Sequence, residues 1–198
     1  MKYLFLILFN IIALTSLAQV NVSINWVQRM PSPDNDTIYY QPDKKLVWQN
    51  FKGDAGKPSI ALAVTSSGLG YNALVKYHGA QTNITMNVYC YFNKQNSWVR
   101  KGRESDYALT HEQHHFDVTY IATNLFIQKL RAANFTRSNY NSVIDRIYKE
   151  SCDELERMQN AYDGQTKNGQ LKDRQYEWNA KIDEQLNGLQ INNRFSSL

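Results

Sequence analysis

The hydrophobic period of the chain changes once along its length, and this change limits the folds that it can adopt. In "NITMNVYCYF", residues 83–92, apolar side chains at every second position alternate with Thr, Asn and Tyr, a pattern typical of a strand with one buried face. Beyond about residue 104, apolar side chains recur at three- and four-residue spacings, as they do in amphipathic helices. Strands followed by helices predict an α+β domain, in which the helices lie on one side of a mostly antiparallel sheet.

Local signals predict further strands in the N-terminal half. The segments 59–66 and 69–77 both read as strands, and Ser67-Gly68 between them is a turn signal. The earlier segment "VNVSINWVQ" predicts an additional strand at the edge of the sheet.

Three helices are expected in the C-terminal half. The first covers residues 107–131, and the second begins at a cap formed by Ser138 or Asn139 and ends where "DGQTKNGQ" interrupts the apolar pattern. A third helix is expected over 171–186, and the polar end of the chain, including residues 191–198, is expected to fray.

The chain opens with "MKYLFLILFNIIALTSLAQ", in which one Lys precedes a run of mainly apolar residues and a small-residue end. This is the pattern of a secretory signal peptide, residues 1–18, and it predicts export to a periplasm or the extracellular space. An uncleaved membrane anchor is the alternative, but the apolar run is short for a span. Residues 19–190 suit a single domain. No second apolar segment of spanning length follows, so no stable membrane insertion is expected.

Charge and cysteine content narrow the possible partners. Without Lys2, the 22 basic side chains fall to 21 against 18 acidic ones, and this mild excess does not favour a nucleic acid as partner. Cys90 and Cys152 could form one disulfide in an oxidising compartment or remain two free thiols, and the sequence leaves both open. A zinc-thiolate site is disfavoured because the chain has no Cys-x-x-Cys pair.

The segment "ALTHEQHHFDV", residues 108–118, contains the sequence His-Glu-x-x-His on the first expected helix. Residues four apart share a helix face, so the imidazoles of His111 and His115 can bind one Zn²⁺, and the helical phase directs both inward. Glu112 would lie beside the metal, where it can take a proton from the attacking water and return it to a leaving amine. His114 is interpreted as a structural residue or as the partner of a ligand, and Asp117 as orienting a neighbour. Such a helix in an α+β domain predicts a zincin-like fold.

A zinc site of this kind needs a third protein ligand. If the first two helices form an antiparallel hairpin, the last turns of the second helix return beside the two histidines. Glu154 or Asp163 could then be the third ligand, and Tyr162 could instead supply its phenol to an oxyanion.

Several segments also resemble those of a known bacterial family. "LVWQNFKG", "ALAVTSSGLGY", "NSWV", "LTHEQHHFDV" and "YDGQTKNGQLKDRQYEWNAKI" are similar, in this order, to segments of "domain of unknown function 922", a family of predicted secreted zinc-dependent proteases. The resemblance covers roughly residues 45–186. Its most specific part is His-Glu-Gln-x-His-Phe-Asp, present here as residues 111–117.

The resemblance implies that His111, Glu112 and His115 form the zinc and catalytic centre. In the family, a segment like Tyr-Asp-x-x-Thr is followed by a His-Gly or related pair, and Asn168 stands here where many members have the His. A neutral amide is a poor substitute for imidazole as a zinc ligand. Asp163 matches the Asp of the pattern and is therefore the preferred third ligand.

Together these features predict an exported zinc-dependent metallopeptidase that hydrolyses a peptide or protein substrate, with Zn²⁺ as cofactor and Glu112 as general base. Two alternatives stay open: a catalytically silent binding or envelope module of the same fold, which Asn168 favours, and a zinc amidase acting on a non-peptide substrate. Glu112 speaks against the silent module, because a structural zinc site has no use for a carboxylate beside the metal. Side-chain specificity depends on pocket shape, which the sequence does not reveal.

Overall fold

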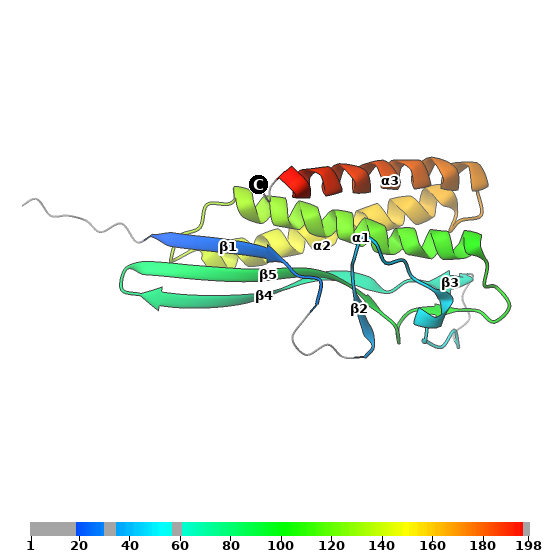
Figure 1. The fold of residues 1–198 in the computed structure, drawn as a ribbon, viewed down its shortest axis with the longest axis horizontal. Helices are drawn as coiled ribbons and strands as arrows, with labels where there is room; N and C mark the ends of the chain where they lie inside the picture. The colour runs from blue at the N-terminus through cyan, green and yellow to red at the C-terminus, as the bar shows by residue number, and fades with distance from the viewer. Residues whose placement is uncertain (1–18, 30–34, 57–60, 196–198) are drawn as a thin grey trace, which may run out of the picture.

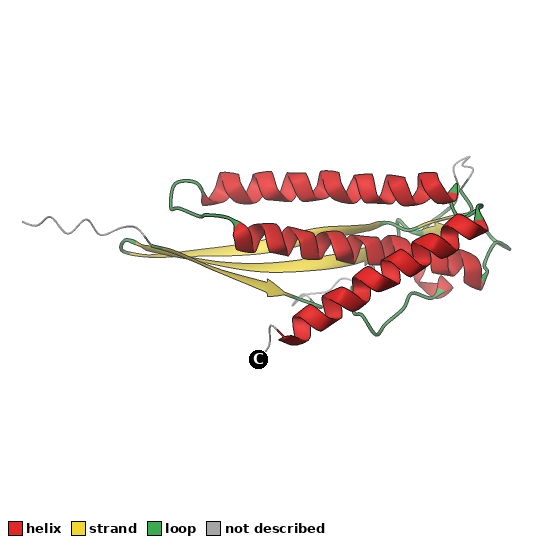
Figure 2. Ribbon diagram, turned by 90° about the horizontal axis from the view of Figure 1, so that it is seen from above, coloured by secondary structure: helices red, strands yellow, loops and turns green. Residues whose placement is uncertain are grey.

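The computed structural model describes residues 19–29, 35–56 and 61–195, and the proposed signal peptide, residues 1–18, lies outside them. The expected α+β class is confirmed: strands fill the N-terminal half and three long helices follow. The helices cover one face of the main sheet, and α1 lies between the sheet and α3 (Figure 1). Seen from above, α2 runs alongside α1 and α3 crosses it obliquely (Figure 2).

The main sheet is built around β5 (Gln81–Asn93). On one side β5 pairs antiparallel with β4 (Ser67–His78). On its other side it pairs parallel with β1 (Val20–Trp26) and antiparallel with β2 (Thr37–Tyr39). The expected edge strand is therefore present, but its parallel direction makes the sheet mixed. The predicted alternation of β5 is confirmed, because its even-numbered side chains from position 82 to position 92 are all buried under the helices.

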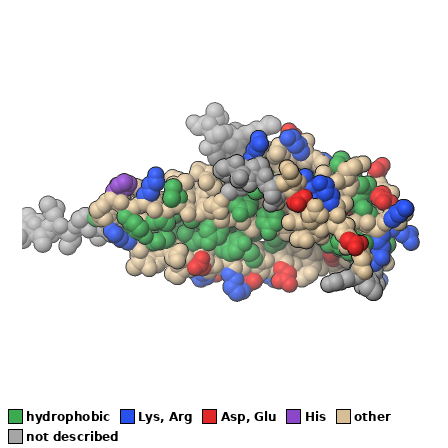
Figure 3. Space-filling view, turned by 90° about the horizontal axis from the view of Figure 1, so that it is seen from below, with side chains coloured by type: hydrophobic (Ala, Val, Ile, Leu, Met, Phe, Trp, Pro, Cys, Tyr) green, Lys and Arg blue, Asp and Glu red, His purple; other side chains and the backbone are tan. Residues whose placement is uncertain are grey.

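The turn expected at Ser67-Gly68 is wrong, since Gly68 and Gly70 lie inside β4. On the sheet face turned away from the helices, a Cβ at Gly68 would lie 2.7 Å from the hydroxyl of Tyr91, and one at Gly70 would lie 2.7 Å from the ring of Tyr89. The glycines thus leave room for two tyrosines, and this face shows side chains of the hydrophobic class, to which Tyr is counted, along its middle (Figure 3). The actual turn follows β4 at Gly79, whose φ is 60°.

A second, two-stranded sheet lies near the start of the first helix. It consists of β3 (Ala63–Val64) and β6 (Trp98–Val99), which pair antiparallel. The strand expected over 59–66 is thus shorter than predicted within the described residues, and its pairing partner is β6, not β4. A single turn of 3₁₀ helix, η1 (Trp48–Asn50), precedes it in the chain.

Helix α1 (Asp106–Ala132) begins at Ser105, whose side chain accepts a hydrogen bond from the backbone N–H of Ala108. Such a cap satisfies one of the amides that the first turn leaves unpaired. From His111 to Thr123 almost every side chain is buried, because the sheet, α2 and α3 all pack against this helix. Its polar residues in this stretch therefore need partners inside the protein.

Helix α2 (Tyr140–Thr166) packs antiparallel to α1, as expected, but continues past Tyr162. Asp163 therefore lies inside its last turn, and the interruption is confined to residues 167–170. Helix α3 (Lys172–Phe195) extends beyond 186, because Leu186 and Leu189 keep packing on the core. Residues 191–195 continue this helix, and 196–198 lie outside the described residues, so the expected fraying of this end stays a prediction.

The two cysteines are both free thiols. Cys90 is fully buried on β5, and burial raises the pKa of its thiol, whereas Cys152 lies half-buried on α2. No helix among the described residues is long and apolar enough to cross a membrane.

Candidate metal centre

Two histidines of α1 point toward one spot at the end of the helical layer. His111 and His115 are one helical turn apart, and their Nε2 atoms lie 3.2 Å from each other. Their rings are nearly perpendicular, with centroids 4.8 Å apart, so the two Nε2 atoms converge while the rings do not stack. Both side chains are mostly buried. The helical phase argument for these two residues is therefore confirmed.

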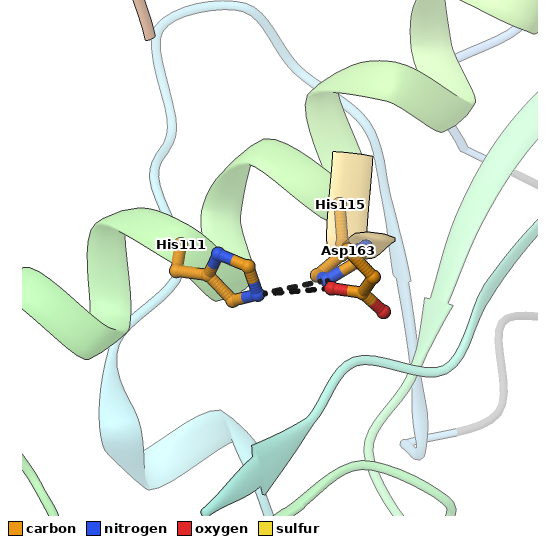
Figure 4. Close-up of side chains that lie close together, drawn as sticks. All are labelled: His111, His115 and Asp163. Carbon is orange, nitrogen blue, oxygen red and sulfur yellow. Dashed lines mark hydrogen bonds and ion pairs between the residues drawn. The ribbon is translucent and has the colours of Figure 1, made fainter. Parts of the chain in front are cut away.

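Asp163 on α2 completes a triangle with these histidines (Figure 4). Its Oδ1 lies 3.2 Å from Nε2 of His111 and 3.1 Å from Nε2 of His115. Ligand atoms at the usual zinc distance in a tetrahedral site lie about 3.3 Å from one another. Among the described His, Cys, Asp and Glu side chains, this is the group that could hold a metal ion. The three distances within this group match the edges of one face of such a tetrahedron.

Two glutamines fix the histidine rings from behind. Nδ1 of His111 lies 2.8 Å from Oε1 of Gln175, and Nδ1 of His115 contacts Oε1 of Gln159. Gln159 must present its oxygen to the ring because its amide N–H donates to the backbone carbonyl of His115 and to Thr119. An amide oxygen only accepts, so each Nδ1 carries the proton. A neutral ring with its proton on Nδ1 directs a bare Nε2 atom at the shared spot, as metal-binding histidines do.

The triangle is made of acceptor atoms, and this favours a cation between them. Oδ1 of Asp163 is buried and has no hydrogen-bond partner among the described residues, and its nearest polar neighbours are the Nε2 atoms of the two imidazoles. Burial by itself raises the pKa of the Asp163 carboxyl, but the imidazoles of His111 and His115 beside it, when they carry a proton, outweigh burial and hold that pKa well below its usual range. The carboxylate is therefore ionised at neutral pH. Three acceptors at these distances repel one another unless a proton or a metal ion lies among them.

Glu112 lies next to this triangle and has no protein partner for one of its oxygens. Its side chain is 5% exposed, and Oε2 is buried without a hydrogen bond among the described residues. A buried polar atom without a partner is costly and calls for an explanation such as an absent water or ion. Glu112 borders the same cleft as the triangle, so a water or substrate there could supply the missing partner.

The cleft in front of the triangle has a volume of about 610 Å³. One wall is formed by residues 61–65, which include β3. The cleft is also lined by residues 102–105 before α1, by Tyr107 and Ala108, and by residues 168–170 and Lys172 around the turn between α2 and α3. The triangle and Glu112 thus lie at the bottom of an open groove that a substrate can enter.

The turn between α2 and α3 holds the triangle in place. Lys167, Asn168 and Gly169 all have positive φ values, and the amides of Lys167 and Asn168 both donate to the backbone carbonyl of Asp163. The hydroxyl of Tyr107 donates to the carbonyl of Gly169. Left-handed conformations of residues other than glycine cost free energy and persist only where the surroundings enforce them. Through these contacts the turn is bonded to the backbone of Asp163 at one end and, at Gly169, packs on the ring of His111.

Gly169 packs directly on the ring of His111, and this contact gives a testable consequence. A Cβ at Gly169 would lie 3.3 Å from Nδ1 of His111, at a φ of 76°. Gly169→Ala is expected to displace the ring from Gln175 and to weaken Zn²⁺ binding by about 10–100-fold, the usual cost of losing such a supporting contact. Competition titration with a chromogenic chelator measures this affinity.

Gly79→Ala is the matched control for this substitution. Gly79 has a φ of 60° but nothing lies within 4 Å of its added Cβ, so the control imposes similar backbone strain without touching a histidine. Both variants should lose about 1 kcal/mol of stability, yet only Gly169→Ala should lose zinc affinity. Equal zinc affinity in the two variants would contradict the role of the turn.

The remaining candidates from the sequence lie elsewhere. Glu154 is paired with Arg157 outside the triangle. Tyr162 is fully buried: its ring stacks on His111, its hydroxyl accepts a hydrogen bond from Gln175, and it does not line the cleft. The suggestion that its phenol serves an oxyanion is therefore wrong. Asn168 lines the cleft but is not part of the triangle.

His114 and Asp117 belong to a separate, buried polar cluster. Asp117 is fully buried and accepts hydrogen bonds from Tyr40, Gln113 and the ring of His114. Burial by itself raises its pKa, but the hydrogen bond to His114 and the nearby Lys45 contribute to a net lowering. The two residues thus join α1 to the segment before η1, as their structural interpretation implied.

Sequence reasoning assigned no role to three residues of this site, namely Gln159, Gln175 and Gly169. Gln159 precedes Asp163 by four residues on α2, so the helical spacing that selected the histidines could have found it. Gln175 and Gly169 have no such helical spacing to the histidines, and they entered only as matches to the segment of the family resemblance, without a role in the site.

Comparisons with known proteins do not identify the chain. No family model matches it, and neither a curated protein nor a solved structure shows significant similarity to it. The interpretation of the site therefore depends on its own geometry and on the sequence resemblance given above.

Proposed function

We propose that the chain is an exported zinc-dependent metallopeptidase. The observation that carries this proposal is the triangle of two imidazole nitrogens and one carboxylate oxygen, 3.1 to 3.2 Å apart, at the bottom of a cleft. The neighbouring carboxylate of Glu112, with one buried oxygen unpartnered, supports a catalytic over a structural site. The resemblance to the family of predicted secreted zinc proteases supports the same activity.

The donor set supports zinc as the metal. His111, His115 and Asp163 offer two nitrogens and one oxygen, the kind of set found in catalytic zinc sites, which keep a fourth position open. Calcium and magnesium prefer oxygen ligands alone. Two histidines and one carboxylate also suit ferrous iron, so the metal analysis has to measure both metals.

In this proposal Glu112 transfers the proton during hydrolysis, and Gln159 and Gln175 position the metal ligands. A bound zinc ion would lower the pKa of a water molecule and polarise the carbonyl that it contacts. The carboxylate of Glu112 accepts a proton from the attacking water and returns it to the nitrogen of the leaving amine. Gln159 and Gln175 hold the rings of His111 and His115 in one orientation, so the ligands need not reorganise during the reaction.

The wall of the cleft favours a peptide over other amide substrates. Val64 pairs with Trp98, and the amide of Arg100 donates to the carbonyl of Leu62. In an antiparallel pair the hydrogen-bonding direction alternates along the strand, so the N–H and C=O of Ala63 point away from β6. An extended peptide lying in the cleft can pair with these groups, as in strand addition to a sheet edge. A compact non-peptide amide has no extended backbone to pair with the N–H and C=O of Ala63.

Metal analysis tests the proposal directly. Protein purified without chelators is expected to hold about one zinc per chain, with little iron. Removing the metal should abolish cleavage of an unstructured polypeptide such as casein, and adding zinc back should restore it. Less than about a tenth of a zinc per chain, or iron in place of zinc, would overturn the metal assignment. Zinc binding without cleavage of any polypeptide would favour the silent module or the amidase instead.

A further inference from the structure

Within the described residues, strand β1 pairs on one side only, and its other edge lies at the end of the sheet far from the cleft (Figure 1). The amide of Thr82 donates to the carbonyl of Gln19, and the amide of Val27 donates to the carbonyl of Val88. In a parallel pair, alternate residues of a strand direct both peptide groups to the neighbour. The odd-numbered residues of β1 therefore bond to β5. Val20, Val22, Ile24 and Trp26 direct their N–H and C=O groups outward, where no residue that the structure describes accepts or donates to them.

A groove runs beside this edge, on the side of the sheet that faces the helices. It has a volume of about 440 Å³ and lies between Val20, Val22 and Ile24 of β1 and the end of α1 with the segment after it. Leu130 and Phe135 are on its far wall. Arg131 and Asn134 also line it. A strand added to β1 would therefore find hydrogen-bonding partners at the edge, and apolar neighbours at Leu130 and Phe135 on the helix side.

The two long edges of the sheet differ in their protection. β4 carries Lys76, and α2 lies along it, with the hydroxyl of Tyr148 donating to the carbonyl of Leu69 and that of Tyr77 bonding to Tyr140. Native proteins block free edges in this way, with charges or covering elements. β1 reads "VNVSINW" and contains neither a charged residue nor a proline. Its edge is thus left open to pairing.

We propose that this edge pairs with β1 of a second copy of the chain. The edge requires an extended partner with apolar side chains on the helix side and small polar ones on the other, and β1 itself has this pattern. Antiparallel pairing about a two-fold axis at Ser23 places Val22 opposite Ile24 and Val20 opposite Trp26. All four outward-facing residues then form hydrogen-bonded pairs, about eight backbone bonds in total. Asn21 lies opposite Asn25, and no like charges oppose each other because β1 has no charged residue. The interface is therefore self-complementary, as a two-fold contact must be.

Charge substitutions at the axis test this pairing. Ser23→Lys is expected to raise the dissociation constant of the dimer about fivefold or more, because two like charges would face each other across the axis. Ser23→Glu should do the same, and mixing the two variants should restore a heterodimer. Leu74→Lys and Leu74→Glu are the controls, because Leu74 is exposed on the same sheet face and neighbours Thr85 from the opposite side of β5, as Ser23 does from β1. Analytical ultracentrifugation over about two decades of concentration measures the dimer.

Val22→Pro is a second, independent probe. It removes a donor from the open edge but keeps the ladder to β5, since the amide of Val22 points outward. It should weaken the dimer about tenfold or more, with an unchanged circular dichroism spectrum. A wild-type chain that stays monomeric throughout would overturn the proposal. So would a dimer that is insensitive to Ser23 charges and is not restored by mixing them.

Discussion

Replacing Glu112 by Gln is expected to lower peptide hydrolysis about 10²–10⁴-fold while the protein keeps its fold and its zinc. Gln has the same shape as Glu but cannot accept the proton of the attacking water. Because Oε2 of Glu112 has no hydrogen-bond partner in the described protein, the substitution breaks no internal bond there. The metal should stay bound, because Glu112 is not part of the triangle. Turnover of a fluorogenic polypeptide and zinc content are the two measurements.

Glu150→Gln is the matched control for this experiment. Glu150 is exposed on α2 and pairs with Arg146, and neither residue lines the cleft. This variant should retain full activity and full zinc content. Equal activity of wild type and Glu112→Gln would remove Glu112 from the mechanism, even if the zinc site itself proved correct. Loss of zinc together with activity would instead assign Glu112 to metal binding.

The placement of the histidines followed from sequence because it depends on local geometry alone. A spacing of four residues on a helix fixes the relative position of two side chains whatever the rest of the protein does. The apolar pattern adds less, because α1 is buried on several sides in this stretch and has no single inward face. The same locality explains why the alternation of β5 was predicted correctly.

Asp163 was harder to place, because the end of a helix depends on tertiary contacts. The residues after Tyr162 include Gly164, which disfavours a helix, and sequence reasoning ended α2 there. In the structure Thr166 is fully buried and its hydroxyl donates to the carbonyl of Tyr162. Packing of this last turn against α1 and α3 outweighs the weak propensity. The extra turn is what brings Asp163 into reach of the histidines.

Gln175 illustrates what sequence patterns cannot supply. It lies 64 residues from His111, on a helix whose orientation is set by the turn after α2. Its amide nitrogen donates to Tyr162 and Asn179, which leaves its oxygen for the histidine. Such a network depends on three helices meeting at one point, and no periodicity in one of them encodes it.

The His-Glu-x-x-His segment serves two purposes on two sides of α1. His111, Glu112 and His115 face the cleft, while the amide oxygen of Gln113 accepts a hydrogen bond from the backbone of Leu46 and its nitrogen donates to Asp117. The residues between the histidines therefore fasten the segment before η1 to the helix that carries the site. A rigid helix held on both sides keeps the ligands preorganised, which metal binding requires.

Replacing Asp163 by Ala is expected to weaken zinc binding by at least about a hundredfold, because loss of a supporting residue behind a ligand already costs about 10–100-fold. The two imidazoles would remain in place through Gln159 and Gln175, but the one negative charge of the triangle would be gone. Zinc should raise the melting temperature of the wild type, since a ligand that binds the folded state stabilises it. This shift should be much smaller in Asp163→Ala at the same zinc concentration, because the stabilisation depends on the ratio of that concentration to the dissociation constant.

Glu154→Ala provides the control on the same helix. Glu154 was the competing candidate from the sequence, and it pairs with Arg157 instead of joining the histidines. Its removal costs only an exposed ion pair, which contributes little to stability, so the zinc-induced shift should equal that of the wild type.

Asp163→Asn separates the effect of charge from that of shape, because the amide keeps the oxygen but not the charge. An intermediate zinc affinity is expected. Unchanged zinc affinity in Asp163→Ala would mean that the triangle does not bind the metal, whatever the outcome for Glu112.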